Sequence, residues 1–65
     1  METREFEHVV YEKDGPVARI ILNNPEAANA QSAQMVHGVN EALDDAQYDY
    51  EIKVVILKAN GKGFC

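Results

Sequence analysis

A glycine-containing segment, NGKGFC at residues 60–65, could bring backbone N–H groups close to an anionic ligand. It follows an apolar run, as phosphate-binding loops do, but two positions do not fit the P-loop motif. That motif requires a glycine five positions before Gly61, where Ile56 stands, and a serine or threonine after Lys62, where Gly63 stands. The segment is therefore either a plain turn or part of another kind of ligand site.

The other reactive side chains form no complete site. His37 and Glu41 are four residues apart and would share one helix face, but two ligands are too few for a closed metal site. An exposed polar pair is the better interpretation. Cys65 would act as a nucleophile only if a nearby base lowered its pKa, and no base can be assigned, so we favour a buried, unreactive thiol. His8 has no ligand cluster near it in the sequence, so we expect it to be structural.

Acidic residues gather near the end of the predicted helix. They lack the spacing of a calcium loop, and we expect them to form a solvated face: Asp44, Asp45, Asp49 and Glu51. None of these groups of residues therefore forms a complete site.

Length and charge exclude several classes of protein. A chain of 65 residues makes at most one small domain, and its single cysteine leaves no internal disulfide. Its 46% hydrophobic and 26% charged residues are typical of a folded protein. A formal net charge of −5 with six scattered basic residues argues against a nucleic-acid partner. No segment approaches the ~20 apolar residues of a membrane span, and no secretory signal is visible, so we expect a cytoplasmic protein without a membrane partner.

The elements that must position these residues follow from periodicity. Alternating side chains predict a strand over residues 6–13, and Asp14-Gly15 predicts a type I′ turn into an antiparallel strand over residues 16–23. NNPEAANAQS reads as a loop, because Pro25 biases the residue before it away from helical angles.

A helix is predicted from about Ser32 to Tyr48. Its buried stripe recurs at three- and four-residue spacing and consists of Met35, Val36, Val39, Leu43 and Ala46. Gly38 weakens the helix, which indicates close packing against a neighbour. KVVILKA, at residues 53–59, has four consecutive apolar residues and is typical of a parallel strand covered on both sides.

The resulting order is β-β-α-β, an α/β arrangement. A right-handed crossover would make the last strand parallel to the second, with the helix on one face of the sheet. The loops NNPEAANA and NGKGFC would then both leave carboxyl ends of parallel strands, where open α/β sheets bind ligands. We therefore expect the two loops to flank one pocket.

These segments resemble the beginning of the enoyl-CoA hydratase/isomerase, or crotonase, superfamily. The resemblance covers nearly the whole chain: the hairpin, an N-x-P-x-x-x-N-A loop, the helix, the VVILKA strand and the GKGFC loop. The motif residues of the first loop are Asn23, Pro25, Asn29 and Ala30. The resemblance implies a ClpP/crotonase spiral fold, of which residues 1–65 would be the incomplete amino-terminal part of a single domain.

The resemblance also implies roles for individual residues. Glu26, Ala27 and Ala28 would border the adenine and pantetheine of coenzyme A, and Phe64 and Cys65 would approach the thioester. The family usually has a basic residue at position 24 or 26, where this chain has asparagine and glutamate, so phosphate contact from this loop is not implied. An oxyanion-hole N–H would come just after position 65, in an Ala-Gly-x-Asp continuation, and the catalytic carboxylates would lie downstream.

The leading hypothesis is an enoyl-CoA hydratase that needs neither metal nor redox cofactor and forms a homotrimer or hexamer when full length. The 65-residue chain, as a truncated part, is expected to be inactive. An isomerase, hydrolase or dehydratase of the same superfamily is an alternative, because those reactions diverge at residues outside this chain. A non-catalytic module that binds coenzyme A or docks onto a full-length relative, and a bare folding fragment, are alternatives of other classes.

Overall fold

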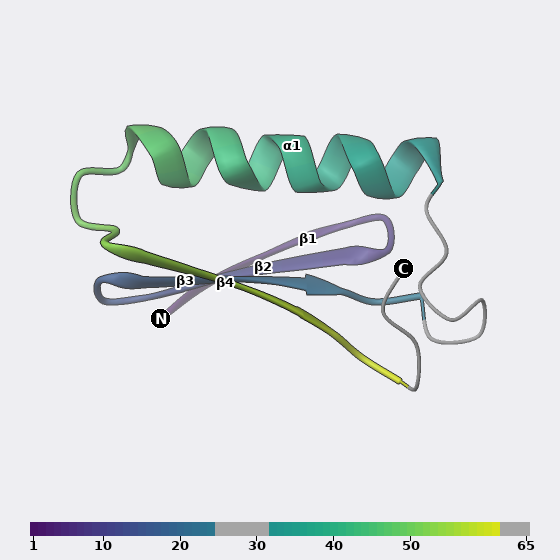
Figure 1. Ribbon diagram of the computed structural model, residues 1–65, viewed down its shortest axis with the longest axis horizontal. Helices are drawn as coiled ribbons and strands as arrows, with labels where there is room; N and C mark the ends of the chain where they lie inside the picture. The colour runs from purple at the N-terminus through teal and green to yellow at the C-terminus, as the bar shows by residue number, and fades with distance from the viewer. Residues whose placement is uncertain (25–31, 62–65) are drawn as a thin grey trace.

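A computed structural model describes residues 1–24 and 32–61 of the chain (Figure 1). These residues form one four-stranded sheet with a helix on one face. The elements, in chain order, are β1 (Glu2–Phe6), β2 (Val9–Asp14), β3 (Val17–Leu22), α1 (Ala33–Tyr48) and β4 (Val54–Ala59). The strands lie in the sheet in the same order as in the chain, antiparallel except that β3 and β4 are parallel. The predicted α/β fold class and the parallel crossover are confirmed.

The amino terminus contains one strand more than the sequence predicted. The single strand expected over residues 6–13 is wrong, because Phe6 ends β1 and Val9 begins β2, with a tight turn between them. His8 adopts a φ of 65° in that turn, a conformation uncommon for a residue other than glycine. The hairpin was not recognisable, because Glu7-His8 is not one of the dipeptides that favour such turns.

The second hairpin lies where it was predicted but uses a different turn. Asp14 pairs with Val17, so Gly15 and Pro16 are its two central residues. Among these central residues only Gly15 has a positive φ, at 59°. A positive φ at the first central position alone is the pattern of a type II′ turn, and it suits a proline at the second position. The predicted type I′ turn is therefore wrong.

The helix begins and ends as predicted. Ser32 caps its N-terminus, with the Oγ atom accepting a hydrogen bond of 3.1 Å from the backbone N–H of Met35. Gly38 faces the sheet so closely that an added Cβ would lie 3.0 Å from the Cβ of Phe6 and 3.1 Å from that of Val9. The close packing inferred from this glycine is confirmed. The core lies between the helix and the sheet and consists of Val9, Tyr11, Ala18, Ile20, Leu22, Met35, Ala42 and Ala46.

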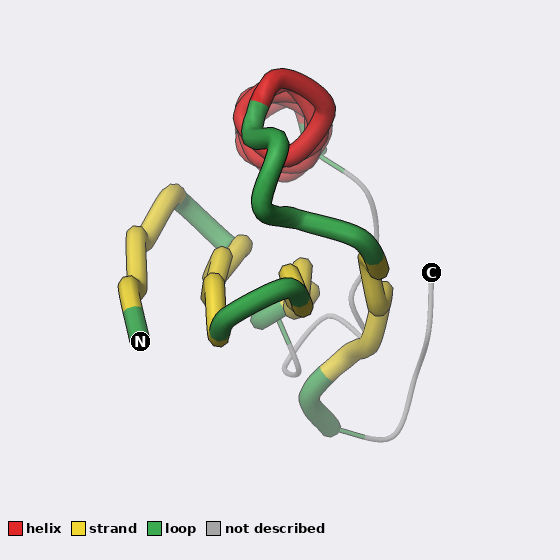
Figure 2. Tube along the Cα trace, turned by 90° about the vertical axis from the view of Figure 1, so that its left-hand side faces the viewer, coloured by secondary structure: helices red, strands yellow, loops and turns green. Residues whose placement is uncertain are grey.

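The helix covers only part of the sheet. Figure 2 shows α1 above β2 and β3, with β4 to one side. Val36 and Leu43, predicted to be buried, are 44% and 45% exposed, and Leu43 borders an open groove that Ile52 and Val55 also line. The four apolar residues of β4 are 42–51% exposed, so the described residues leave this strand largely uncovered. No helix within the described ranges has the length and apolar content needed to cross a membrane.

Candidate functional site

The candidate site lies at the edge of the sheet where β3 and β4 end. The two strands are parallel neighbours in register, so Leu22, the last residue of β3, lies beside Ala59, the last residue of β4. The chain therefore leaves the sheet from two adjacent points, as predicted from the order of the elements. In parallel sheets this edge is the usual place for ligands.

Two asparagines connect the chain exits. Asn23 follows β3 and Asn60 follows β4, and the Nδ2 atom of Asn60 donates a hydrogen bond of 3.1 Å to the Oδ1 atom of Asn23. Backbone hydrogen bonds hold the same residues: Asn23 N–H donates to the His8 carbonyl at 2.8 Å, and Asn60 N–H donates to the Leu22 carbonyl at 2.9 Å. The turn between β1 and β2, the end of β3 and the end of β4 are thus joined at one edge.

The predicted coenzyme A contacts lie outside the described residues. They are Glu26, Ala27, Ala28, Phe64 and Cys65.

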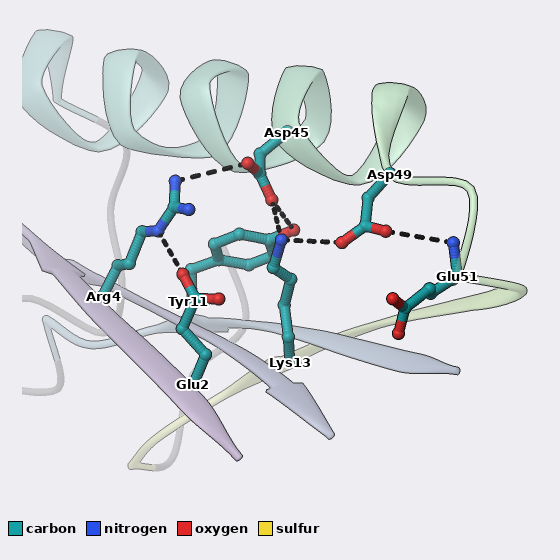
Figure 3. Close-up of polar contacts among 7 residues, drawn as sticks. All are labelled: Glu2, Arg4, Tyr11, Lys13, Asp45, Asp49 and Glu51. Atoms are coloured by element: carbon teal, nitrogen blue, oxygen red, sulfur yellow. Dashed lines mark hydrogen bonds and ion pairs between the residues drawn. The ribbon is translucent and has the colours of Figure 1, made fainter. Parts of the chain in front are cut away.

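A second group of polar residues fastens α1 to β1 and β2 (Figure 3). The Oδ2 atom of Asp45 accepts a hydrogen bond of 2.8 Å from the Tyr11 hydroxyl and lies 2.6 Å from Lys13 Nζ. Lys13 Nζ also lies 2.8 Å from Asp49, and the Oδ1 atom of Asp45 is 3.3 Å from Arg4. We call Arg4, Tyr11, Lys13, Asp45 and Asp49 the helix clamp.

The clamp shifts the ionisation of its members in the directions its contacts require. The pKa of Tyr11 is raised to about 12, mainly by burial and secondly by the hydrogen bond to Asp45. Hydrogen bonds to the two carboxylates raise the pKa of Lys13, and the hydrogen bond from Lys13 is the main reason why the pKa of Asp45 and of Asp49 is lowered. Near neutral pH Lys13, Asp45 and Asp49 are therefore ionised, and the Tyr11 hydroxyl keeps its proton.

This arrangement is structural rather than catalytic. An opposite-charge set whose pKa values are all moved away from neutrality is poorly suited to proton transfer near pH 7. An open groove of about 970 Å³ runs beside the clamp, and residues of both β1 and α1 line it. Lys13 lies near the start of β3, at the other end of the sheet from Asn23 and Asn60. We therefore do not assign this groove to the candidate site.

The clamp corrects the prediction of a solvated acidic face. Asp45 and Asp49 are half-buried and paired, whereas Asp44 and Glu51 are exposed. The interpretation of the helix histidine is confirmed: His37 Nε2 lies 3.8 Å from Glu41, and both side chains are exposed. His8, half-buried in the first turn, contributes its carbonyl to the sheet edge.

Comparison with known proteins places this fold in a family. The family described as Enoyl-CoA hydratase/isomerase matches residues 12–65. The chain is 41% identical over 63 residues to EchA13 of Mycobacterium tuberculosis, provisionally named an enoyl-CoA hydratase, and the match covers 94% of this chain and 20% of that protein. It is 32% identical over 60 residues to trans-2-decenoyl-[acyl-carrier-protein] isomerase of Streptococcus mutans, covering 92% of this chain and 23% of that protein.

Solved structures agree with this assignment. An enoyl-CoA hydratase/isomerase from Mycobacterium paratuberculosis superposes with a TM-score of 0.90 at 34% identity, covering 94% of this chain and 24% of the other. An enoyl-CoA hydratase from Mycobacterium avium has a TM-score of 0.84 at 39% identity, covering 89% and 25%. The chain thus spans about a fifth to a quarter of the length of these relatives. Its sequence and its fold together establish that the chain belongs to the enoyl-CoA hydratase/isomerase family, as an amino-terminal portion.

Proposed function

We propose that this chain is the amino-terminal part of an enoyl-CoA hydratase, which adds water across the double bond of a 2-enoyl-CoA. The observation that carries the proposal is the pairing of β3 with β4, whose last residues, Leu22 and Ala59, lie side by side. Segments that follow two adjacent parallel strands start close enough together to border one ligand. Family membership supplies the class of that ligand, an acyl thioester of coenzyme A.

In this proposal the two segments divide the substrate between them. Glu26, Ala27 and Ala28 contact the adenine and pantetheine, and Phe64 and Cys65 approach the thioester. The next backbone N–H, just after Cys65, serves as one of two donors to the thioester oxygen. Donors of this kind stabilise the charge that develops on the oxygen, and removing one costs about 10²–10³ in rate.

Hydration then requires a base and an acid. The hydroxyl of water adds to the β-carbon while a carboxylate accepts its proton, the resulting enolate is held by the two N–H donors, and a proton is delivered to the α-carbon. We place both carboxylates in the part of the parent protein that follows residue 65, and we propose that no metal or redox cofactor takes part. The 65-residue chain alone is then inactive, because in this proposal it holds part of the substrate site and neither catalytic carboxylate.

The oligomer and the compartment are further parts of the proposal. For the full-length protein we propose a homotrimer, or a pair of trimers, which is the assembly that the family resemblance implies. A reducing cytoplasm suits the single cysteine, since proteins of oxidising compartments usually pair their cysteines.

An isomerase is the second candidate, favoured by one observation. The relative from Streptococcus mutans, 32% identical to this chain, is named as an isomerase of a trans-2-decenoyl thioester. Hydratases and isomerases both pass through a thioester enolate, so the same pair of N–H donors serves either reaction.

The test uses the full-length protein encoded by the gene that contains this segment. Gene sequencing past the codon for Cys65 should give Ala-Gly-x-Asp. Hydration of crotonyl-CoA removes the double bond conjugated to the thioester, so the ultraviolet absorbance of that conjugation should fall. Incubation with a 3-enoyl-CoA separates the candidates, because an isomerase would create the conjugated bond and raise the absorbance. A full-length protein that changes neither substrate would refute both candidates.

A further inference from the structure

We draw no further inference here: the strongest candidate, the open groove between α1 and β4 that Leu43, Ile52 and Val55 line, carries nothing because no feature of the described residues shows what covers it.

Discussion

Replacing Tyr11 by phenylalanine removes one hydroxyl from the interface between α1 and β2 and changes little else. The Tyr11 side chain is 1% exposed, and its hydroxyl donates to Asp45 at 2.8 Å. A hydrogen bond to a charged acceptor stabilises a fold by about 1.5–3 kcal/mol. Asp45 keeps Lys13 and Arg4 as partners and is one-quarter exposed, so water can replace the lost donor in part. We therefore expect Tyr11→Phe to lower the free energy of unfolding by about 1–2 kcal/mol.

Urea unfolding followed by far-ultraviolet circular dichroism measures this loss. Tyr48→Phe is the matched control, because Tyr48 is the last residue of α1 and its side chain is 74% exposed. Its effect should fall within about 0.5 kcal/mol of zero. A 65-residue chain is marginally stable, so the predicted loss is a large fraction of the total. Equal midpoints for wild type and Tyr11→Phe would refute the reasoning that the hydroxyl stabilises the clamp.

The pH dependence of the same pair tests the cause. The pKa of Tyr11 is raised from 10.0 to about 12, first by burial and second by Asp45. A raised pKa means that the stabilisation is fully present below the unfolded value of about 10 and is lost as the pH rises through the folded value. The difference in unfolding free energy between wild type and Tyr11→Phe should therefore be constant from neutral pH to about pH 10 and shrink between about pH 10 and pH 12. A difference that grows in this range would contradict the account.

Three further predictions concern the helix. Gly38→Ala should lower the free energy of unfolding by about 1 kcal/mol net, as measured by urea unfolding. The added methyl group would press against the Cβ atoms of Phe6 and Val9, and this strain of about 1–3 kcal/mol exceeds the gain in helix propensity. Ser32→Ala removes the N-cap acceptor and should cost about 1 kcal/mol, with thermal unfolding as the readout, whereas Ser32→Asp should be tolerated. The hydrogen bond from Lys13 lowers the pKa of Asp45, so ionised Asp45 stabilises the fold above about pH 4, and this stabilisation is lost as the pH falls further. Asp45→Asn should therefore make the free energy of unfolding depend less steeply on pH in the acid range, as measured by urea unfolding at several pH values.

Local patterns predicted the helix and the central hairpin well, and physical reasons account for the misses. Ser32, the apolar spacing after it and the turn after β2 all act over a few residues, and the structure confirms the elements that they indicated. Strand β1 has an almost entirely exposed, polar sequence and a turn at His8 that no favoured dipeptide marks. The predicted buried stripe of α1 wrongly included Val36 and Leu43, because periodicity does not reveal how much of the sheet the helix covers.

The candidate site was predictable only as far as topology determines it. The order of the elements and the handedness of the crossover place the ends of β3 and β4 together, and the register confirms this. The bond between Asn23 and Asn60 required knowledge of that register, although an asparagine directly after each of two parallel strands was a visible signal. The helix clamp was missed for a related reason: Tyr11 and Asp45 are 34 residues apart, and Asp45 read as one more acid on a charged helix face.

The most direct test of the central claim is the turnover of crotonyl-CoA by the full-length protein that contains this segment. The account predicts a loss of the conjugated enoyl absorbance, with 3-hydroxybutyryl-CoA formed in equal amount. A folded full-length protein that binds no coenzyme A thioester and leaves crotonyl-CoA unchanged would contradict it.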